Sequence, residues 1–498
     1  MNVQELYDDL TRDAGLKLIS ATSVERFIRA PINFWCEVNA PTEEKEPLDP
    51  YHQRLFSQGN AYQNQVIQES YPGTVQAPFL NEDEGLRRTL ELMAQGAPAI
   101  GNMPLLSRPD GVAGRPDVLV RDDTQGSNLG NFGYQVVEIK AVRKITRGHI
   151  LQAAMYNRLL GRVLGHESPE FYLLNLEGTM QTVQMAEIAA ELDWALDEMR
   201  QILAGKPVEP CYGGADWPWT DYVNQQAIAA RDVSLVPGLG ESKRKAFASA
   251  GYTTVETLAG AKPEALTSIK GVGAINAGRF LTSAQAICQD RPVPRSTEWR
   301  LPQCTVEVFL DLEGADSGLD SEGPGREGTG WVNYLIGNVI RWPGRPATYK
   351  PFFAASFEQE GLILGEFFQW AGTLEDARFY HWHHYEKTHL TRMASSHGLE
   401  PALVSRVLDR LVDLSPITTG SFAFPTYSEG LKDIAKYLGF TWRQEDVSGQ
   451  SSMALYQEYV ESGGTDDKTR QKLLDYNEDD CRATLHIFDW LTGERADE

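Results

Sequence analysis

The sequence predicts a multidomain α/β protein in which a small all-α module separates two α/β domains. A chain of 498 residues is too long for one ordinary hydrophobic core, so about three domains are expected. Strand-like apolar runs followed by helical patterns occur in residues 1–230 and 300–498, which is typical of α/β domains. Residues 231–291 instead contain glycine turns that each open a helix. These ranges are the expected domains.

The composition is that of a globular protein, with 23% charged and 42% hydrophobic residues. No apolar run approaches the roughly 20 residues of a membrane span, and the acidic N-terminus lacks a secretory pattern. We therefore expect a cytoplasmic protein with no membrane partner. The five cysteines give neither a disulfide framework nor a zinc spacing. A net charge of −23 argues against coating nucleic acid by bulk electrostatics, but metal sites themselves need acidic clusters.

A β-hairpin is predicted in the first domain. Residues 114–120 read GRPDVLV and residues 134–140 read YQVVEIK, and the polar residues 122–131 form a natural turn between them. Glu138 and Lys140 are two apart and share a strand face, and pairing across the hairpin can bring Asp117 beside them. Two carboxylates can bind Mg²⁺ or Mn²⁺, while a lysine holds the attacking water or offsets negative charge. This combination suits phosphodiester hydrolysis.

The hairpin resembles the PD-(D/E)XK nuclease motif, in which Pro-Asp and Glu-x-Lys match residues 116–117 and 138–140. Gln152 and Tyr156 follow at helical i, i+4 spacing, and this pair resembles the Gln-x-x-x-Tyr signature of the RecB-like branch. The resemblance implies a restriction-endonuclease-like domain over residues 1–230. The alternative interpretation is a surface hairpin with a Glu/Lys pair.

Two departures from the RecB-like pattern concern metal ligands. Some RecB-like nucleases hold an iron-sulfur cluster with one cysteine near Cys36 and three after the core, but here only Cys211 follows, so no iron-sulfur cluster is expected. A His or Glu ligand usually stands where this chain has Gln63, and a neutral amide is a weaker ligand. Further elements are predicted as a helix over 20–35, a helix beginning at Gly59, a strand over 171–176, and a helix over 181–204.

Residues 231–291 contain two similar turns about 33 residues apart. In each, a Gly-x-Gly turn precedes a helix, so that backbone amides and the helix N-terminus face outward toward an anion. The region holds eight Lys/Arg against five Asp/Glu, a reversal of the chain's overall sign. It resembles a tandem helix-hairpin-helix module that grips DNA backbone without reading sequence; a helical spacer is the alternative. The candidate nucleic-acid-binding residues are Gly238, Gly240, Lys243, Lys245, Lys270, Gly271 and Gly273.

A second acidic constellation is predicted beyond the linker-like residues 291–296. Residues 305–314 read as a strand in which Asp311 and Glu313 share a face, and residues 331–340 fit the next strand. Tyr476 and Asp480 are four apart on the last helix. His381, His383 and His384 invite a zinc interpretation, but no cysteine or fourth ligand is nearby, so roles in the core or toward substrate are favoured. Asp413 is expected to be structural.

The order and spacing of these acidic motifs resemble those of the DEDDy exonucleases of the RNase H-like superfamily. Asp311-x-Glu313 matches the first motif, Tyr476-x-x-x-Asp480 the third, and Glu386 falls where the second motif has aspartate, which keeps the charge on a longer side chain. In that family four carboxylates bind two metal ions and the tyrosine orients the water. The resemblance therefore implies Mg²⁺ or Mn²⁺ as the cofactor, with Asp311, Glu313, Glu386 and Asp480 as ligands.

The order of domains resembles predicted RecB-like nucleases that carry a C-terminal YprB-like exonuclease domain. It implies a metal-dependent deoxyribonuclease, an exonuclease acting on single-stranded DNA or on ends in DNA processing or repair. RNA as a substrate and a helicase as a partner stay open. The competing hypothesis is a catalytically impaired clamp or helicase-associated adaptor, which Gln63 and Glu386 favour and the other motif residues oppose.

Overall fold

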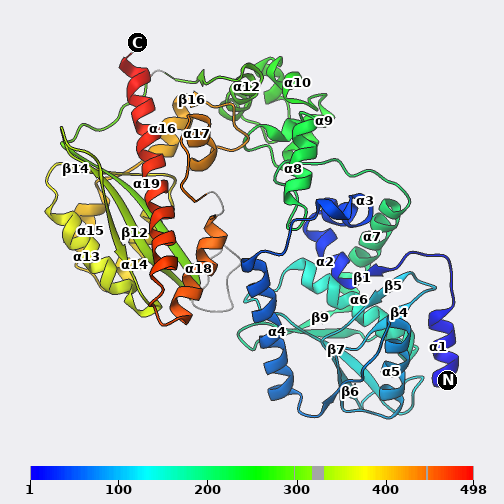
Figure 1. Cartoon of the computed structure of the whole chain (residues 1–498). Helices are drawn as coiled ribbons and strands as arrows, with labels where there is room; N and C mark the ends of the chain where they lie inside the picture. Colours follow the sequence, from blue (N-terminus) through cyan, green and yellow to red (C-terminus); the bar gives the residue numbers. More distant parts are fainter. Residues whose placement is uncertain (1, 297, 317–329, 445–446, 497–498) are drawn as a thin grey trace. The chain divides into compact units, whose positions relative to one another are not determined.

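The computed structural model describes residues 2–296, 298–316, 330–444 and 447–496, and the chain forms two compact units (Figure 1). The first unit comprises residues 1–210 and 214–222, and the second comprises residues 211–213 and 223–498. In the described part of the chain, no helix is long and apolar enough to cross a membrane.

The first unit is built on a mixed sheet of six strands in the order β2-β3-β6-β7-β8-β9. These are β2 (Thr74–Val75), β3 (Ala99–Gly101), β6 (Val118–Asp122), β7 (Gly133–Ile139), β8 (Glu170–Leu174) and β9 (Met180–Gln184). A smaller sheet joins β1 (Ile19–Ser20), β5 (Val112–Gly114) and β4 (Leu105–Ser107). The helices are α1 (Val3–Thr11), α2 (Ala21–Arg29), α3 (Pro31–Asn39), α4 (Pro50–Ser70), α5 (Glu82–Ala94), α6 (Arg147–Leu164) and α7 (Met185–Leu203).

The predicted hairpin is confirmed as β6 and β7, which pair antiparallel with Val118 opposite Val137. Strand alternation sends the two faces of β7 into different cores. Val136 packs into the large core that includes α6, whereas Val137 and Ile139 pack against α4 on the other face. Glu138 therefore shares the α6 face of the sheet with Val136.

Several predicted helix limits of the first unit were wrong. The pattern over 20–35 is two helices, α2 and α3, because Pro31 cannot continue α2 and instead stands at the first position of α3. The helix expected from Gly59 begins at Pro50, capped by Asp49. Residues 180–184 are strand β9, so the helix expected from residue 181 begins at Met185.

The second unit begins with a helical module that has its own core. Its helices are α9 (Glu241–Ser249), α10 (Val255–Ala259), α11 (Pro263–Thr267) and α12 (Ala274–Gln289), and α8 (Thr220–Ala229) leads into it across the unit boundary. Phe247 and Phe280 meet edge to face at 5.6 Å between ring centroids, inside a cluster of buried aliphatic residues. The predicted all-α module is therefore present.

The rest of the second unit is an α/β domain around a five-stranded sheet in the order β13-β12-β11-β14-β15. These strands are β11 (Val306–Asp316), β12 (Trp331–Arg341), β13 (Thr348–Phe353), β14 (Ala377–His381) and β15 (Leu411–Asp413). Strands β11 to β13 are antiparallel, and β14 and β15 run parallel to β11. The helices are α13 (Glu360–Thr373), α14 (Tyr385–Ser396), α15 (Pro401–Leu408), α16 (Leu414–Ser421), α17 (Leu431–Tyr437), α18 (Gly449–Glu461) and α19 (Asp467–Ala496).

The long helix α19 lies along one face of this sheet (Figure 1). Phe309 of β11 packs there against Phe488 of α19, with ring centroids 5.4 Å apart. Residues 311 and 313 alternate onto the same face as Phe309, so they also point toward α19. The sequence placed the opening of this helix near Leu474, but it begins at Asp467.

The segment between the helical module and the α/β domain is not a free linker. Val293 and Pro294 form strand β10, which pairs with β16 (Phe422–Ala423) of the α/β domain. Arg295 is buried and bonds Glu429 at 2.9 Å, and Arg279 of α12 bonds the same carboxylate at 2.8 Å. The linker predicted at residues 291–296 is therefore anchored to the α/β domain by the pairing of β10 with β16 and by a partly exposed ion pair.

Candidate active site

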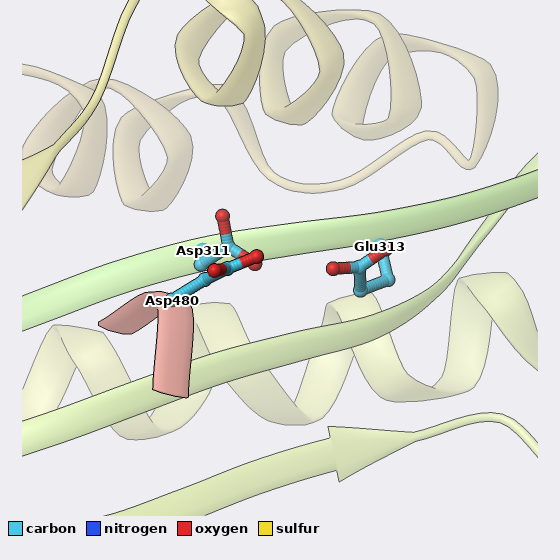
Figure 2. Close-up of side chains that lie close together, drawn as sticks. All are labelled: Asp311, Glu313 and Asp480. Atoms are coloured by element: carbon cyan, nitrogen blue, oxygen red, sulfur yellow. The ribbon is translucent and has the colours of Figure 1, made fainter. Parts of the chain in front are cut away.

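Three carboxylates converge between β11 and α19 in the second unit. Asp311 and Glu313 come from the strand and Asp480 from the helix (Figure 2). One ligand atom from each lies within 4.8 Å of the others. The structure thus brings together residues separated by about 170 positions in the sequence.

Each of these carboxylates accepts a hydrogen bond from a neutral donor. Asn477 Nδ2 donates to Asp311 Oδ2 at 2.7 Å, and Ser452 Oγ donates to Glu313 Oε2 at 3.1 Å. Trp442 Nε1 donates to Asp480 Oδ1 at 2.7 Å. These three donors fix the carboxylates without neutralising their charge. No motif pointed to Ser452 or Trp442, whereas Asn477 stands next to the motif residue Tyr476.

The electrostatics of this group favour a bound cation. Burial, followed by the neighbouring Asp480 and Glu313 carboxylates, raises the pKa of Asp311 well above its usual range. Burial and the same crowding raise the pKa of Glu313 to about 8, and burial raises the pKa of Asp480 to about 6. Oxygen anions held together against their mutual repulsion are the ligands that Mg²⁺ and Mn²⁺ prefer. The donor set therefore fits such an ion.

Glu386 is not part of this group of three. It stands in the first turn of α14, is buried, and its Oε2 lies 3.1 Å from His381 Nδ1. Its charge still contributes to the raised pKa of Asp311, after Asp480 and Glu313. The fourth candidate ligand thus lies near the site but is held by a histidine.

Among the described residues, His381, His383 and His384 do not form a metal centre with other possible ligands, and the group of potential metal ligands is that of Asp311, Glu313 and Asp480. The backbone amide of His383 donates to Asp413 Oδ1 at 3.0 Å. Asp413 also caps α16 through Ser415, which confirms the structural role expected of it. The zinc interpretation of the histidines gains no support from this geometry.

Tyr476 lies one helical turn before Asp480 and is buried, with 3% of its surface exposed. Burial and the three carboxylates raise the pKa of its hydroxyl well above the usual range, so the tyrosine stays protonated and can donate a hydrogen bond. The ammonium of Lys432 lies 4.5 Å from the centroid of its ring. Lys432 was not predicted from the sequence, because it lies outside the matched motifs.

The first unit brings the other predicted site residues together around β7 and α6. Lys140 Nζ lies 3.0 Å from Glu138 Oε1 and donates to Gln152 Oε1 at 2.7 Å. Gln152 Nε2 in turn donates to the hydroxyl of Tyr156 at 2.9 Å. Burial would lower the pKa of Lys140, but the carboxylates of Glu138 and Asp117 raise it instead.

Both oxygens of Asp117 accept hydrogen bonds from this chain. Gln63 Nε2 donates to Oδ1 at 2.6 Å, and the backbone amide of Ile139 donates to Oδ2 at 2.7 Å. Burial, followed by the Glu138 carboxylate, raises the pKa of Asp117 well above its usual range. Gln63 thus occupies the position expected of a ligand, but its amide meets Asp117 as a donor. This cluster offers two carboxylates, against three in the second unit.

The two glycine turns of the helical module are nearly identical. Gly238 and Gly271 both have φ of +84°, a conformation that L side chains rarely adopt, and Gly240 and Gly273 cap the helices that follow. Added Cβ atoms at Gly240, Gly271 and Gly273 would meet nothing within 4 Å, whereas one at Gly238 would lie 3.5 Å from the ring of Phe280, so three of the four glycines border open space. Open backbone amides at helix N-termini suit phosphate oxygens.

The basic residues of the module divide into two groups. Arg244 forms a buried pair with Asp232 at 2.7 Å, and Arg231 pairs with Glu256. By contrast, Lys243, Lys245 and Lys270 are exposed, although Lys243 donates to the carbonyl of Gly238 and Lys245 pairs with Glu241. Arg231 and Arg244 are thus used in ion pairs within the module. The number of positive charges that can contact a ligand is therefore smaller than the count of Lys and Arg in the sequence.

Cys36 and Cys211 are both buried free thiols. Burial, with the Glu37 carboxylate, raises the pKa of Cys36 to about 12, and burial raises the pKa of Cys211. Protonated thiols are poor metal ligands. The expected absence of an iron-sulfur cluster stays a prediction.

This sheet order and these acidic residues, beside a tandem hairpin module, are features of nucleic-acid-processing nucleases. Comparison with known families supports this class: residues 309–492 match the RNase_H superfamily, and residues 230–285 match the SAM-like helix-hairpin-helix tandem. No curated protein matches the chain. The predicted RNase H-like domain and the predicted hairpin module are thereby confirmed, while the RecB-like assignment of the first unit stays a prediction.

The raised pKa of Glu313 predicts how metal stabilisation depends on pH. A carboxyl whose pKa is higher in the folded state binds its proton more tightly there, so the metal-free protein should lose stability as pH rises from about 4.5 toward about 8. A bound ion replaces that proton and offsets the loss. Thermal unfolding should therefore show a larger stabilisation by Mg²⁺ over EDTA at pH 8 than at about pH 5.5. An equal shift at both pH values, or none, would contradict this.

Proposed function

We propose that the protein is a metal-dependent nuclease that hydrolyses phosphodiester bonds of DNA, acting as an exonuclease on single strands or ends in DNA processing or repair. The observation that carries this proposal is the group of Asp311, Glu313 and Asp480 within 4.8 Å of one another, inside a domain that matches the RNase_H superfamily. The open glycine turns of the same unit support nucleic acid as the substrate. Assignment to DNA rests on the resemblance of the hairpin module to backbone-gripping DNA modules.

The three carboxylates would hold a divalent ion, which when bound supplies charge neutralisation at the phosphate and activates water. The chain's own residues prepare this site. Asn477, Ser452 and Trp442 orient the carboxylates, as their hydrogen bonds indicate. The protonated hydroxyl of Tyr476, which bonds Asp480, is proposed to orient the attacking water. The net reaction adds water across a P–O bond, leaving a phosphomonoester and an alcohol.

The helical module is proposed to bind the DNA backbone through Lys243, Lys245 and Lys270 together with the amides of its glycine turns. Replacing the three lysines with alanine should weaken binding to all sequences alike. On single-stranded DNA, each lost phosphate contact removes about 0.7 from the slope of log K against log salt, so the slope should fall by about two. Fluorescence anisotropy with a single-stranded oligonucleotide at several salt concentrations measures this.

The matched control replaces three other exposed lysines with alanine: Lys17, Lys206 and Lys468. It has the same change in net charge, so it separates local contacts from bulk attraction. Arg244 is kept in both variants because its loss would leave Asp232 buried and unpaired. Equal slopes for both variants would contradict the proposed role of the module.

A second candidate function has specific support in the first unit. The cluster of Asp117, Glu138 and Lys140 is proposed as a RecB-like PD-(D/E)XK nuclease site. Gln152 accepts a hydrogen bond from the lysine and in turn donates one to the hydroxyl of Tyr156. The contact of Gln63 with Asp117 instead favours a clamp or a helicase-associated adaptor that has lost this activity. The domain limits 1–230, 231–291 and 300–498 are proposed from the sequence patterns and family resemblances.

Incubation of the purified protein with end-labelled single- and double-stranded DNA and RNA, in Mg²⁺, Mn²⁺ or EDTA, tests the proposed function. Degradation of DNA that EDTA abolishes is expected, and the ladder of products reports polarity. Binding without degradation in either metal would replace the nuclease with the clamp. Degradation of RNA alone would reverse the assignment of substrate.

A further inference from the structure

Lys432 places an ammonium against the ring of Tyr476, within electrostatic reach of Glu313 and Asp480. It is the second residue of α17, is half-buried, and has its Nζ 4.5 Å from the ring centroid of Tyr476. Tyr476 and Asp480 stand one turn apart on α19, so α17 and α19 bring the lysine to the metal-binding group. The positive charge of Lys432 also acts on Glu313 and Asp480, where it opposes the effect of burial on their pKa values.

Among the described residues, no carboxylate forms an ion pair with this ammonium within 4.0 Å. Within the residues that the structure describes, its hydrogen-bond acceptor is the carbonyl oxygen of Val447, at 3.4 Å. An ammonium has three donor hydrogens, so a single long bond leaves donors available. A lysine placed only to stabilise the fold would be expected to form a close ion pair, as Arg443 does with Asp479 at 2.8 Å.

The charges at the site balance with one divalent ion and one ammonium. Before substrate binds, the group of three carboxylates carries three negative charges, which a divalent ion and Lys432 together neutralise. A second divalent ion would need a further carboxylate, and the candidate from the motif, Glu386, lies outside the group of three and is bonded to His381. Since excess positive charge in a buried site is costly, the site is better matched to one ion than to two.

We propose that Lys432 is a catalytic residue that replaces a second metal ion, donating a hydrogen bond to a nonbridging oxygen of the scissile phosphate. This inference rests on the proposed nuclease function. The water oxygen forms a bond to phosphorus and the P–O ester bond breaks. The water loses one proton to solvent, and the departing oxygen takes up one proton from solvent. The ammonium is neither consumed nor deprotonated, and it stabilises the charge that grows on the phosphate oxygens.

The test compares Lys432→Met and Lys432→Arg with the control Lys436→Met, an exposed lysine one turn further along α17. Lys432→Met should lower kcat about 100-fold, as loss of one transition-state donor does, and Lys432→Arg should recover part of it. Binding of Mn²⁺ to the full chain, measured by electron paramagnetic resonance, should become tighter in Lys432→Met because a neighbouring positive charge is gone. Tighter Mn²⁺ binding with an unchanged kcat would mean that Lys432 acts on the metal site by its charge alone, and it would overturn the catalytic role.

The number of ions is found by subtracting the Mn²⁺ bound to Asp311→Asn from that bound to the wild type, and one ion is expected. A difference of two ions would overturn the role of Lys432 but not the nuclease function. The same holds if the wild type is active and Lys432→Met is equally active. A wild type that degrades no nucleic acid would overturn the nuclease and this role together. Circular dichroism checks that each variant folds. If Lys432→Met does not fold, the comparison of Lys432→Arg with the wild type still tests the role of the lysine.

Discussion

Replacing Asp311 and Asp480 together with asparagine is expected to abolish metal-dependent degradation, by at least about 1000-fold, because the loss of several kcal/mol of charge stabilisation corresponds to that factor. Glu138→Gln with Lys140→Met is expected to leave most of the activity. The difference follows from the ligands. The second unit offers three carboxylates within 4.8 Å, whereas Asp117 and Glu138 are two, and both Asp117 oxygens already accept hydrogen bonds.

Asparagine keeps the size of aspartate, so the first pair removes charge without opening a cavity. Each variant is assayed on end-labelled DNA over a range of Mn²⁺, with thermal unfolding as the check on folding. Loss of activity only in the variant of the first unit would reverse the ranking and make the RecB-like site the working nuclease. Loss in both would show that the two sites depend on each other.

Gly337→Ala is expected to reduce activity about 10- to 100-fold and to destabilise the second unit by about 1–3 kcal/mol, the usual cost of overpacking. Gly337 lies directly opposite Asp311 on β12, and the side-chain oxygen of Asn477 fills the space that a Cβ would occupy. Asn477 would have to move. It would then lose its hydrogen bonds to Asp311 at 2.7 Å and to the hydroxyl of Tyr349 at 2.7 Å.

The matched control is Gly365→Ala, because Gly365 lies in α13 of the same domain and an added Cβ there meets nothing within 4 Å. That change should slightly stabilise the helix and leave activity intact. The measurements are kcat on labelled DNA and the free energy of unfolding in urea. If Gly337→Ala unfolds no more easily than Gly365→Ala and keeps full activity, Asn477 does not position Asp311.

The parts of the sites that the sequence predicted depend on local periodicity. Asp311 and Glu313 share a face because strand side chains alternate, and Gln152 contacts Tyr156 because residues four apart lie together on a helix. The matched turns at Gly238 and Gly271 were readable because each needs positive φ. Such rules relate neighbours in the chain, and they hold in whatever fold the chain adopts.

The parts that the sequence did not predict depend on contacts between distant segments. Trp442 and Ser452 reach the carboxylates only after α18 and α19 have packed on β11. Arg244 counted as a free positive charge until the fold buried it against Asp232. Helix limits failed where a cap or a proline decided them, as at Asp49 and Pro31. Composition alone could not predict these donors, this ion pair or these helix limits.

The attachment of α12 to the α/β domain through β10, β16 and Glu429 has a consequence for the proposed nuclease. These contacts join the helical module and the α/β domain within one compact unit. Nucleic acid bound at the glycine turns would therefore stay attached to the same unit that carries the three carboxylates.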